Sequence, residues 1–306
     1  MATRILVTGG AGFLGNHLVS RLINEKLQVV VLDNFSSESG SRVTPATKTI
    51  RGDIREKETV RGAVSQADQI VHLAAIVSIT ESIKNPQSTI AVNVDGTRNM
   101  LEEAKSAGVK KFVFASSCSV YGEAKYLPMD EKHPCMPISP YASSKLAAEG
   151  LCKDFSSKKG LDVSILRFFN IYGPGQKAGP YAGVISNFFD NLKRSRPLQI
   201  FGNGDQVRDF IFVEDVVEAI VRCIKSPGTS SNILNVGSGA ALSINQLARE
   251  CQEVVGRDVS VNHLEARSGD IERSCADITL MRQDLSFHPR FAIKEGLEKT
   301  LKGNAS

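Results

Sequence analysis

The sequence predicts a doubly wound α/β fold, a parallel sheet covered by helices on both faces, with a smaller α/β domain at its C-terminal end. Short apolar runs rich in β-branched residues alternate with segments of helical periodicity through the first half of the chain. These runs lack polar alternation, which is typical of strands buried on both faces of a parallel sheet. After Asn170, a stretch rich in Gly and Pro at 172–181 interrupts the pattern, so we expect a domain boundary there.

The strands of the sheet are expected in six runs that share this apolar character. The runs are residues 5–8, 29–33, 49–53, 70–74, 111–116 and 163–169. Beyond the boundary, the pattern predicts a helix over 184–193 and a short strand over 198–201.

The last part of the chain is expected to cross back to the sheet. Asp215 and Glu218 have the spacing of a capping box, which predicts a helix from there through Cys223. A strand over 232–236 then follows and is expected to join the first sheet. We therefore assign the first domain to residues 1–170, with a return near 205–237, and the second domain to residues 171–306.

Charge and composition exclude several classes of protein. The 306 residues carry 37 Lys and Arg against 33 Asp and Glu, and this net charge of +4 is too small for a nucleic-acid-binding surface. The six cysteines contain no CxxC pair, so we expect no zinc module, no other metal site and no disulfide framework. Without a signal peptide or a run of 18 apolar residues, we expect a cytoplasmic protein that binds no membrane.

A glycine-rich turn follows the first predicted strand. Gly9, Gly12 and Gly15 allow a tight turn, a close approach to a pyrophosphate and close packing of the next helix on the strand. Phe13 and Leu14 open that helix, whose N–H groups can bind the anion. Such turns also occur without a ligand, but the strand, helix and second strand around this one indicate a Rossmann-type dinucleotide site.

The residues at the ends of the second and third strands indicate which dinucleotide binds. Asp33 would accept hydrogen bonds from the two ribose hydroxyls and repel a 2′-phosphate, which favours NAD over NADP. Asp53 and Ile54 could border the adenine, although a simple turn explains them as well. An ATP-binding P-loop is excluded because Gly15 is followed by Asn16 rather than by Lys.

A tyrosine and a lysine form the candidate catalytic pair. Tyr141 and Lys145 are four residues apart, so one helix presents both on the same face. A lysine ammonium and an oxidised nicotinamide would favour the phenolate of a tyrosine, whose ordinary pKa is near 10. The tyrosinate could then take a hydroxyl proton while hydride leaves the same carbon. This spacing alone is common on solvated helices, so the catalytic interpretation of the pair depends on the surrounding sequence. That sequence includes Ser116 and Ser117 on the preceding strand.

The combination of these motifs resembles the extended branch of the short-chain dehydrogenase/reductase superfamily, the NAD-dependent epimerases and dehydratases of nucleotide sugars. The likeness covers nearly the whole chain and is greatest to the UDP-glucose 4-epimerases. Further matches are the segments 71–75, 120–122, 167–174, 202–205, 208–210 and 267–270, and Asn93.

The resemblance assigns roles to individual residues. Ser117 would hydrogen-bond the sugar hydroxyl, Tyr141 would act as acid and base, and Lys145 would bind the nicotinamide ribose. The residues it implies for NAD are Gly9, Gly12, Phe13, Leu14, Asp33, Asn34, Asp53, Ile54, Leu73, Ala74, Ala75, Asn93, Tyr141, Lys145 and Phe168. Those it implies for the nucleotide sugar are Ser117, Tyr141, Asn170, Arg208, Arg267, Asp270 and Ser274.

The resemblance also selects among reactions. Dehydratases of this branch carry Thr-Asp-Glu before Val-Tyr-Gly, whereas this chain has Ser117, Cys118 and Ser119, so elimination and decarboxylation are disfavoured. We therefore predict 4-epimerisation of a UDP-hexose by transient C4 oxidation. The small Ser274 leaves room for an N-acetyl group, and a glucuronate substrate stays open. Cys118 keeps open a 4-keto-sugar epimerase/reductase, although that enzyme prefers NADPH and Asp33 argues against it.

Two other classes of function are consistent with a dinucleotide fold. One is a plain sugar dehydrogenase that releases NADH, and the other is an NAD-sensing protein without chemistry, which the Tyr141 and Lys145 pair disfavours. The resemblance further implies a homodimer, in which the helices after Thr89 and after Tyr141 form a four-helix bundle.

Overall fold

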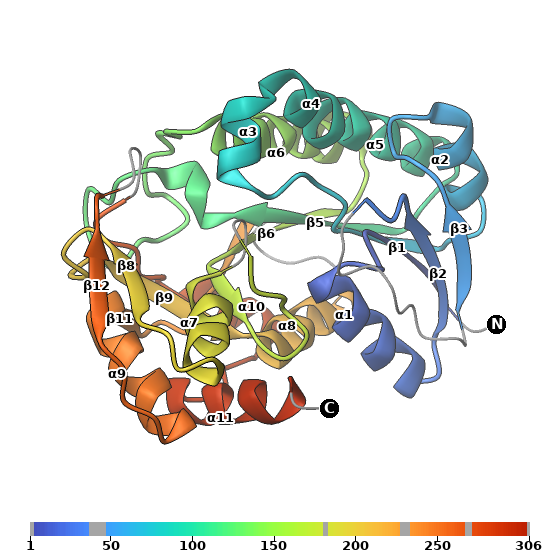
Figure 1. The fold of residues 1–306 in the computed structure, drawn as a ribbon. Coiled ribbons are helices and arrows are strands. Elements are labelled where there is room, and N and C mark those ends of the chain that lie inside the picture. The colour runs from blue at the N-terminus through green and yellow to red at the C-terminus, as the bar shows by residue number, and fades with distance from the viewer. Residues whose placement is uncertain (1–2, 37–46, 180–182, 227–232, 267–270, 305–306) are drawn as a thin grey trace.

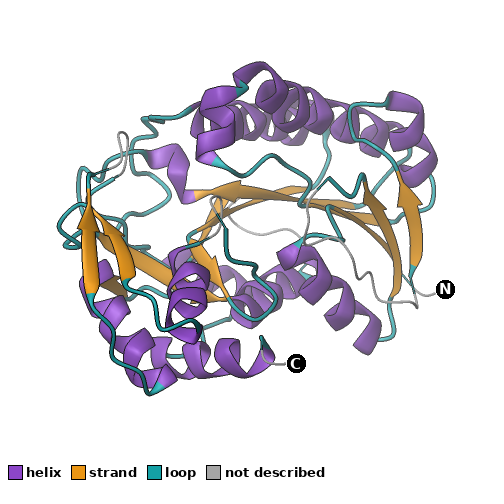
Figure 2. Ribbon diagram, viewed as in Figure 1, coloured by secondary structure: helices purple, strands orange, loops and turns teal. Residues whose placement is uncertain are grey.

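The computed structural model describes residues 3–36, 47–179, 183–226, 233–266 and 271–304. Its centre is a sheet of seven parallel strands with helices on both faces (Figures 1 and 2). In spatial order the strands are β10 (Ile233–Val236), β6 (Val163–Phe168), β5 (Lys111–Ser117), β4 (Gln69–His72), β1 (Arg4–Thr8), β2 (Gln28–Asp33) and β3 (Lys48–Arg51). The strand order reverses between β1 and β4, so the doubly wound fold is confirmed.

Successive side chains of each strand enter two hydrophobic cores. On β1, Ile5 and Val7 join one core and Leu6 joins the other. The first core is covered by α1 (Phe13–Asn24), α8 (Val213–Lys225) and α10 (Thr279–Leu285). The second core is covered by α2 (Lys57–Val64), α5 (Thr97–Ser106) and α6 (Pro140–Lys159).

Short helices connect β4 to α5 and lie against the N-terminal half of α6. They are α3 (Ile79–Lys84), α4 (Pro86–Ile90) and the π-helical turn η1 (Ala91–Gly96). The 3₁₀ turn η2 (Cys118–Tyr121) follows β5 directly. Together these connections surround the first turn of α6, where the candidate tyrosine lies.

A third hydrophobic core lies beside the C-terminal edge of the large sheet (Figure 1). Its strands are β7 (Asn170–Tyr172), β9 (Val207–Phe212) and β11 (Ala241–Ser243) in one sheet, and β8 (Leu198–Phe201) and β12 (Val261–Leu264) in another. Its helices are α7 (Val184–Lys193), α9 (Ile244–Val255) and α11 (Ile293–Gly303). The chain leaves this core through α8 and pairs β10 with β6; the division at residue 170 stays a prediction.

Two local expectations differ from the structure. The third and fourth strands end at Arg51 and His72, so Asp53 and Ala74 lie in the loops after them. The capping box at Asp215 was wrong, because α8 already begins at Val213. The Asp215 carboxylate is buried and instead accepts hydrogen bonds from the backbone N–H groups of Arg290 and Phe291, at 3.0 and 3.2 Å.

Candidate active site

A cavity of about 580 Å³ lies at the C-terminal edge of the large sheet, where the loops after β1 to β6 meet. Parallel strands bring their C-terminal ends together at one edge, and ligands of such sheets bind there. Of the residues predicted to bind a cofactor, its wall contains Gly9, Gly12, Phe13, Leu14, Asp33, Asn34, Asp53, Ile54, Leu73, Ala74, Ala75, Tyr141, Lys145 and Phe168.

The glycine loop has the geometry that an anion requires. Gly9 has a φ of +69°, and a Cβ there would lie 2.8 Å from the backbone nitrogen of Ala74, so only glycine fits. Gly12 precedes the first turn of α1 and supplies no side-chain cap. Phe13, Leu14 and Gly15 of that turn line the cavity, so the start of α1 offers its backbone N–H groups there without a competing side chain, which suits a pyrophosphate.

The Asp33 carboxylate is fixed at the end of β2. It accepts hydrogen bonds from the backbone N–H groups of Ala11 at 2.9 Å and Phe35 at 2.7 Å. Both bonds hold the Asp33 carboxylate beside the glycine loop, where it could accept hydrogen bonds from a ribose. The glycine loop and Asp33 therefore fit NAD, and the negative charge disfavours the additional phosphate of NADP.

Asp53 lies on the same side of the cavity as Asn34. Arg55 donates two hydrogen bonds to its carboxylate, at 2.9 and 2.8 Å, and Asn34 donates one at 3.0 Å. The bonds from Arg55 hold the pKa of Asp53 well below its ordinary value, although burial opposes them. The neighbouring Ile54 packs over Gly96 and gives the cavity an apolar wall.

Asn93 lies behind the cavity wall. Its amide accepts from the backbone nitrogen of Ile76 at 2.8 Å and donates to the oxygen of the same residue at 2.9 Å. It also donates to the Ser144 hydroxyl at 2.9 Å, and its side chain is fully buried. Asn93 therefore fixes the loop after β4 against α6, and its direct contact with NAD stays a prediction.

The three candidate catalytic residues line the same cavity. The Ser139 hydroxyl caps α6 by accepting from the backbone nitrogen of Ala142 at 3.1 Å, which fixes the first turn that carries Tyr141. Lys145 follows one turn later on the buried face. Ser117 ends β5, and its hydroxyl acts on the Tyr141 phenol by lowering the pKa of that group. The structure thus brings the predicted Ser, Tyr and Lys together.

The protonation of these groups differs from the sequence-based expectation. Burial raises the pKa of Tyr141 to about 12, although the hydrogen bond with Ser117 lowers it. Burial lowers the pKa of Lys145 to about 8, and its amine donates to the backbone oxygen of Ala115 at 2.8 Å. Desolvation therefore outweighs the help that Lys145 was expected to give to the phenolate.

The burial of Lys145 predicts a pH dependence of stability. Between pH 8 and 10.5 the unfolded chain holds a proton that folded Lys145 has released, so this group makes the protein more stable as pH rises. Lys145→Met removes this titration. We therefore expect the free energy of unfolding of the variant, relative to that of wild type, to be higher at pH 7 than at pH 10. Urea unfolding at both pH values measures it, with the exposed Lys153→Met on the same helix as control. If the difference in free energy of unfolding between variant and wild type were the same at both pH values, the lowered pKa of Lys145 would be contradicted.

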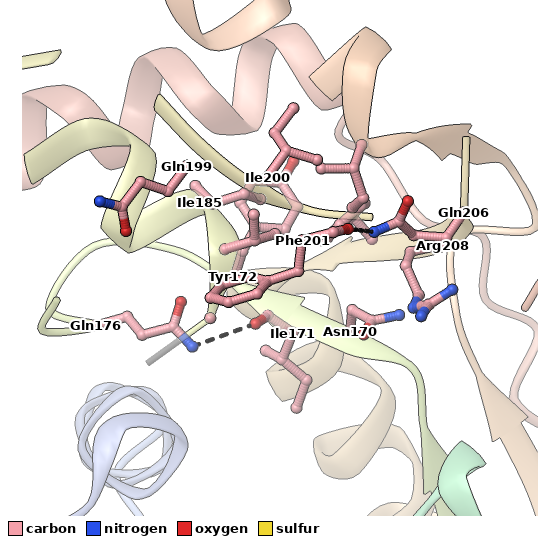
Figure 3. Close-up of a pocket in the computed structure, with 14 residues that line it drawn as sticks. Asn170, Ile171, Tyr172, Gln176, Ile185, Gln199, Ile200, Phe201, Gln206 and Arg208 are labelled. Atoms are coloured by element: carbon pink, nitrogen blue, oxygen red, sulfur yellow. Dashed lines mark hydrogen bonds between the residues drawn. The ribbon is translucent and has the colours of Figure 1, made fainter. Parts of the chain in front are cut away.

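A second cavity, of about 360 Å³, opens beside β7, β8 and β9 (Figure 3). Asn170 and Arg208 line it, as the resemblance implied. The Asn170 amide donates to the Asp209 backbone oxygen at 2.8 Å, and Arg208 donates to the Val207 oxygen at 2.9 Å. The cavity therefore offers an amide and a guanidinium to an anionic ligand.

Three predicted substrate residues remain. Arg267 and Asp270 fall outside the described residues. Ser274 is fully buried and borders neither of the two cavities, and its hydroxyl lies beside the Cys118 thiol. Its contact with the sugar stays a prediction.

Sequence reasoning missed several residues of the second cavity. Gln199 and Phe201 lie two apart on β8, and Gln206 follows in the turn before β9. Gln176 borders both cavities. The alternation along β8, with Leu198 and Ile200 buried and Gln199 exposed, was the available signal, but four residues are too few for it to identify a ligand site.

Two kinds of feature are absent from the residues that the structure describes. Within those ranges, none of the helices is both long and apolar enough to cross a bilayer. The same part of the chain contains no group of three or more His, Cys, Asp and Glu side chains arranged to hold a metal ion.

Comparisons with known proteins agree with this geometry. The sequence pattern of the NAD dependent epimerase/dehydratase family matches residues 5–237. A putative UDP-glucose 4-epimerase of Methanocaldococcus jannaschii is 36% identical over 299 residues, covering 97% of each chain. A UDP-N-acetyl-α-D-glucosaminuronate decarboxylase of Bacillus cytotoxicus is 33% identical and covers 99% of this chain and 98% of its own.

Solved structures with the same fold carry related ligands. The UDP-glucose 4-epimerase of Thermotoga maritima with UDP-glucose has a TM-score of 0.95, 34% identity and 98% coverage of both chains. A UDP-N-acetylglucosamine 4-epimerase of Methanobrevibacter ruminantium has a TM-score of 0.93, 33% identity and coverage of 99% and 98%. The Thermus thermophilus UDP-glucose 4-epimerase complex with NAD has a TM-score of 0.91, 34% identity and 99% coverage of both.

Proposed function

The chain belongs to the NAD-dependent epimerase/dehydratase family, and on that premise we propose that it epimerises a UDP-hexose at C4. UDP-glucose and UDP-galactose are the proposed pair, and the N-acetyl forms are proposed as further substrates. The family supports an enzyme that uses NAD and acts on nucleotide sugars, and the reaction within that family is our proposal.

The residues after β5 carry the choice of reaction. Cys118 and Ser119 occupy the positions where the resemblance places the Asp and Glu carboxylates of a dehydratase. Burial raises the pKa of Cys118 to about 11, so its thiol is neutral at physiological pH. The neighbouring Asp209 carboxylate accepts hydrogen bonds from Ser238, Gly239 and Ala276, which occupy its oxygens. These groups supply no acid and base pair for elimination, which favours epimerisation.

Tyr141 would move the proton of the sugar 4-hydroxyl. With a pKa near 12 its phenol is protonated at neutral pH and is set to donate to a 4-keto oxygen. It acts as a base once positive charge is added beside it. Oxidised NAD, when bound, supplies such a charge together with the hydride acceptor. Ser117, which lines the same cavity as Tyr141, would orient the substrate oxygen with its hydroxyl.

The second cavity is the proposed place of the nucleotide. Asn170 and Arg208 border it, and Ile171 joins it to the cavity that holds Tyr141. Arg267 and Asp270 stay proposed contacts of the diphosphate and sugar. The proposal for N-acetyl sugars is supported by the solved UDP-N-acetylglucosamine 4-epimerase, whereas the buried Ser274, which borders neither cavity, gives it no geometric support.

Product analysis tests the proposal. The purified protein, loaded with NAD, is incubated with UDP-glucose, UDP-N-acetylglucosamine and UDP-glucuronate, and the sugars are separated by chromatography. We expect UDP-galactose and UDP-N-acetylgalactosamine without net absorbance from NADH. Steady accumulation of NADH would identify a dehydrogenase instead. If only UDP-glucuronate were converted, the protein would be a UDP-glucuronate 4-epimerase and not a UDP-hexose 4-epimerase. If only UDP-glucose were converted, the proposal that N-acetyl sugars are substrates would be wrong.

We also propose a cytoplasmic homodimer. All six cysteines are free thiols, which fits a reducing compartment. Helices α5 and α6 lie side by side on the outer face of the second core (Figure 1), so two copies could join them into a four-helix bundle. Light scattering on the purified protein would give the mass, and a monomer would contradict this arrangement.

A further inference from the structure

The two cavities meet at a single place. Among the described residues that line them, Ile171 and Gln176 border both. Ile171 lies on β7, and Gln176 lies in the loop between β7 and α7 (Figure 3). A ligand that extends from the second cavity to Tyr141 must therefore pass the Gln176 side chain.

Two contacts fix the direction of the Gln176 amide. The buried Ser186 hydroxyl donates to its oxygen at 3.0 Å, and its nitrogen faces the Ile171 backbone oxygen at 3.5 Å (Figure 3). The reverse amide orientation would place two oxygens against each other at Ile171, so the contacts agree on one assignment. The bond to Ile171 is at the long limit for a hydrogen bond. The NH₂ group can therefore exchange this bond for a shorter one to a ligand at the junction.

The loop that carries Gln176 is attached on several sides. The His17 ring on α1 is hydrogen-bonded to the Pro174 oxygen at 2.8 Å, which ties the loop to the helix of the glycine motif. The Gly175 nitrogen donates to the Asn304 side chain at 2.8 Å. These bonds hold the amide at a set position, so its contact with a ligand requires little ordering of the loop.

We propose that Gln176 is a substrate-positioning residue that donates a hydrogen bond from its NH₂ group to the diphosphate or sugar where a UDP-sugar crosses between the cavities. This inference rests on the proposed function, because it takes the ligand to be a UDP-sugar. A neutral donor complements the Arg208 guanidinium in the second cavity, since it binds an anionic oxygen without adding a buried charge.

Binding of two probes to the NAD-loaded protein tests the role of Gln176. UDP-glucose spans the junction, whereas UMP lacks the second phosphate and the sugar. In Gln176→Glu the hydroxyl of Ser186 keeps an oxygen acceptor, but the donor at the junction becomes an anion. We expect calorimetry to show UDP-glucose weakened by roughly 10- to 100-fold and UMP by less than about threefold. Gln176→Leu removes the donor without adding charge. It should likewise weaken UDP-glucose more than UMP.

The matched control is Gln28→Glu, the same change at an exposed position at the opposite edge of the large sheet. It should leave both affinities as in wild type. Equal weakening of UDP-glucose and UMP in the Gln176 variants would indicate a structural role and overturn the inference. Unchanged UDP-glucose affinity would overturn it while the proposed function stands. A wild-type protein that binds neither probe would overturn the proposed function and this inference with it.

Discussion

Tyr141→Phe is expected to lower kcat for epimerisation by about 10³-fold, within the range of 10²- to 10⁴-fold for loss of a general acid and base. The hydroxyl is the only part removed, and Tyr141 lines the cavity together with Ser117. Because the ring still fills its place in the first turn of α6, KM for the UDP-sugar should change little. Steady-state kinetics with UDP-glucose at neutral pH measure both constants.

The control for this loss is another tyrosine hydroxyl. Tyr126 is 46% exposed, borders neither of the two cavities and donates to Asp130 at 2.8 Å. Tyr126→Phe should therefore keep kcat within about twofold of wild type, as surface changes do. If Tyr141→Phe epimerised at the wild-type rate, another group would carry the proton, and Cys118 or Lys145 would be the next to replace.

The parts of the site that could be predicted from the sequence are those encoded by neighbouring residues. The glycine loop combines a turn that needs a positive φ at Gly9 with a helix start, and both are local. Tyr141 and Lys145 share a face because the helix period places residues four apart on one side. The strands likewise follow from continuous apolar runs, although their ends depend on pairing and differ by a few residues.

The parts that could not be predicted depend on partners distant in the chain. Asp215 looked like a cap, but its carboxylate is bound by the backbone of Arg290 and Phe291, which lie far along the sequence. The amide of Asn93 is bonded to Ile76 and Ser144, which lie 17 and 51 residues away in the chain. The pKa of Tyr141 follows from its burial, which no local pattern reports.

The buried residue Glu149 was also not identified from the sequence pattern. It lies on the buried face of α6, one turn beyond Lys145, and is fully buried together with Arg167 on β6. The Arg167 guanidinium donates to its carboxylate at 2.9 and 2.7 Å, and the Ser116 hydroxyl donates at 2.6 Å. The guanidinium also lies over the Tyr121 ring, 4.7 Å from its centre. One carboxylate thus ties α6 to β5 and β6, the elements that carry the candidate catalytic residues.

Glu149→Gln is expected to lower the free energy of unfolding by about 3–5 kcal/mol, the cost of leaving one charge of a buried pair without its partner. Urea unfolding followed by circular dichroism measures this. The control is Asp154→Asn on the same helix, whose exposed pair with Lys158 at 2.8 Å should contribute less than about 0.5 kcal/mol.

A double variant separates the charge from the packing. Glu149→Gln combined with Arg167→Met removes both charges and keeps similar side-chain volumes, so it should recover much of the lost stability. If Glu149→Gln cost no more than Asp154→Asn, the buried pair would not hold α6 on the sheet. Because Ser116 adjoins Ser117, Glu149→Gln should also lower kcat at temperatures where it stays folded, whereas Asp154→Asn should not. The Glu149 carboxylate would then account for both the stability of the buried pair and the alignment of the candidate catalytic serine.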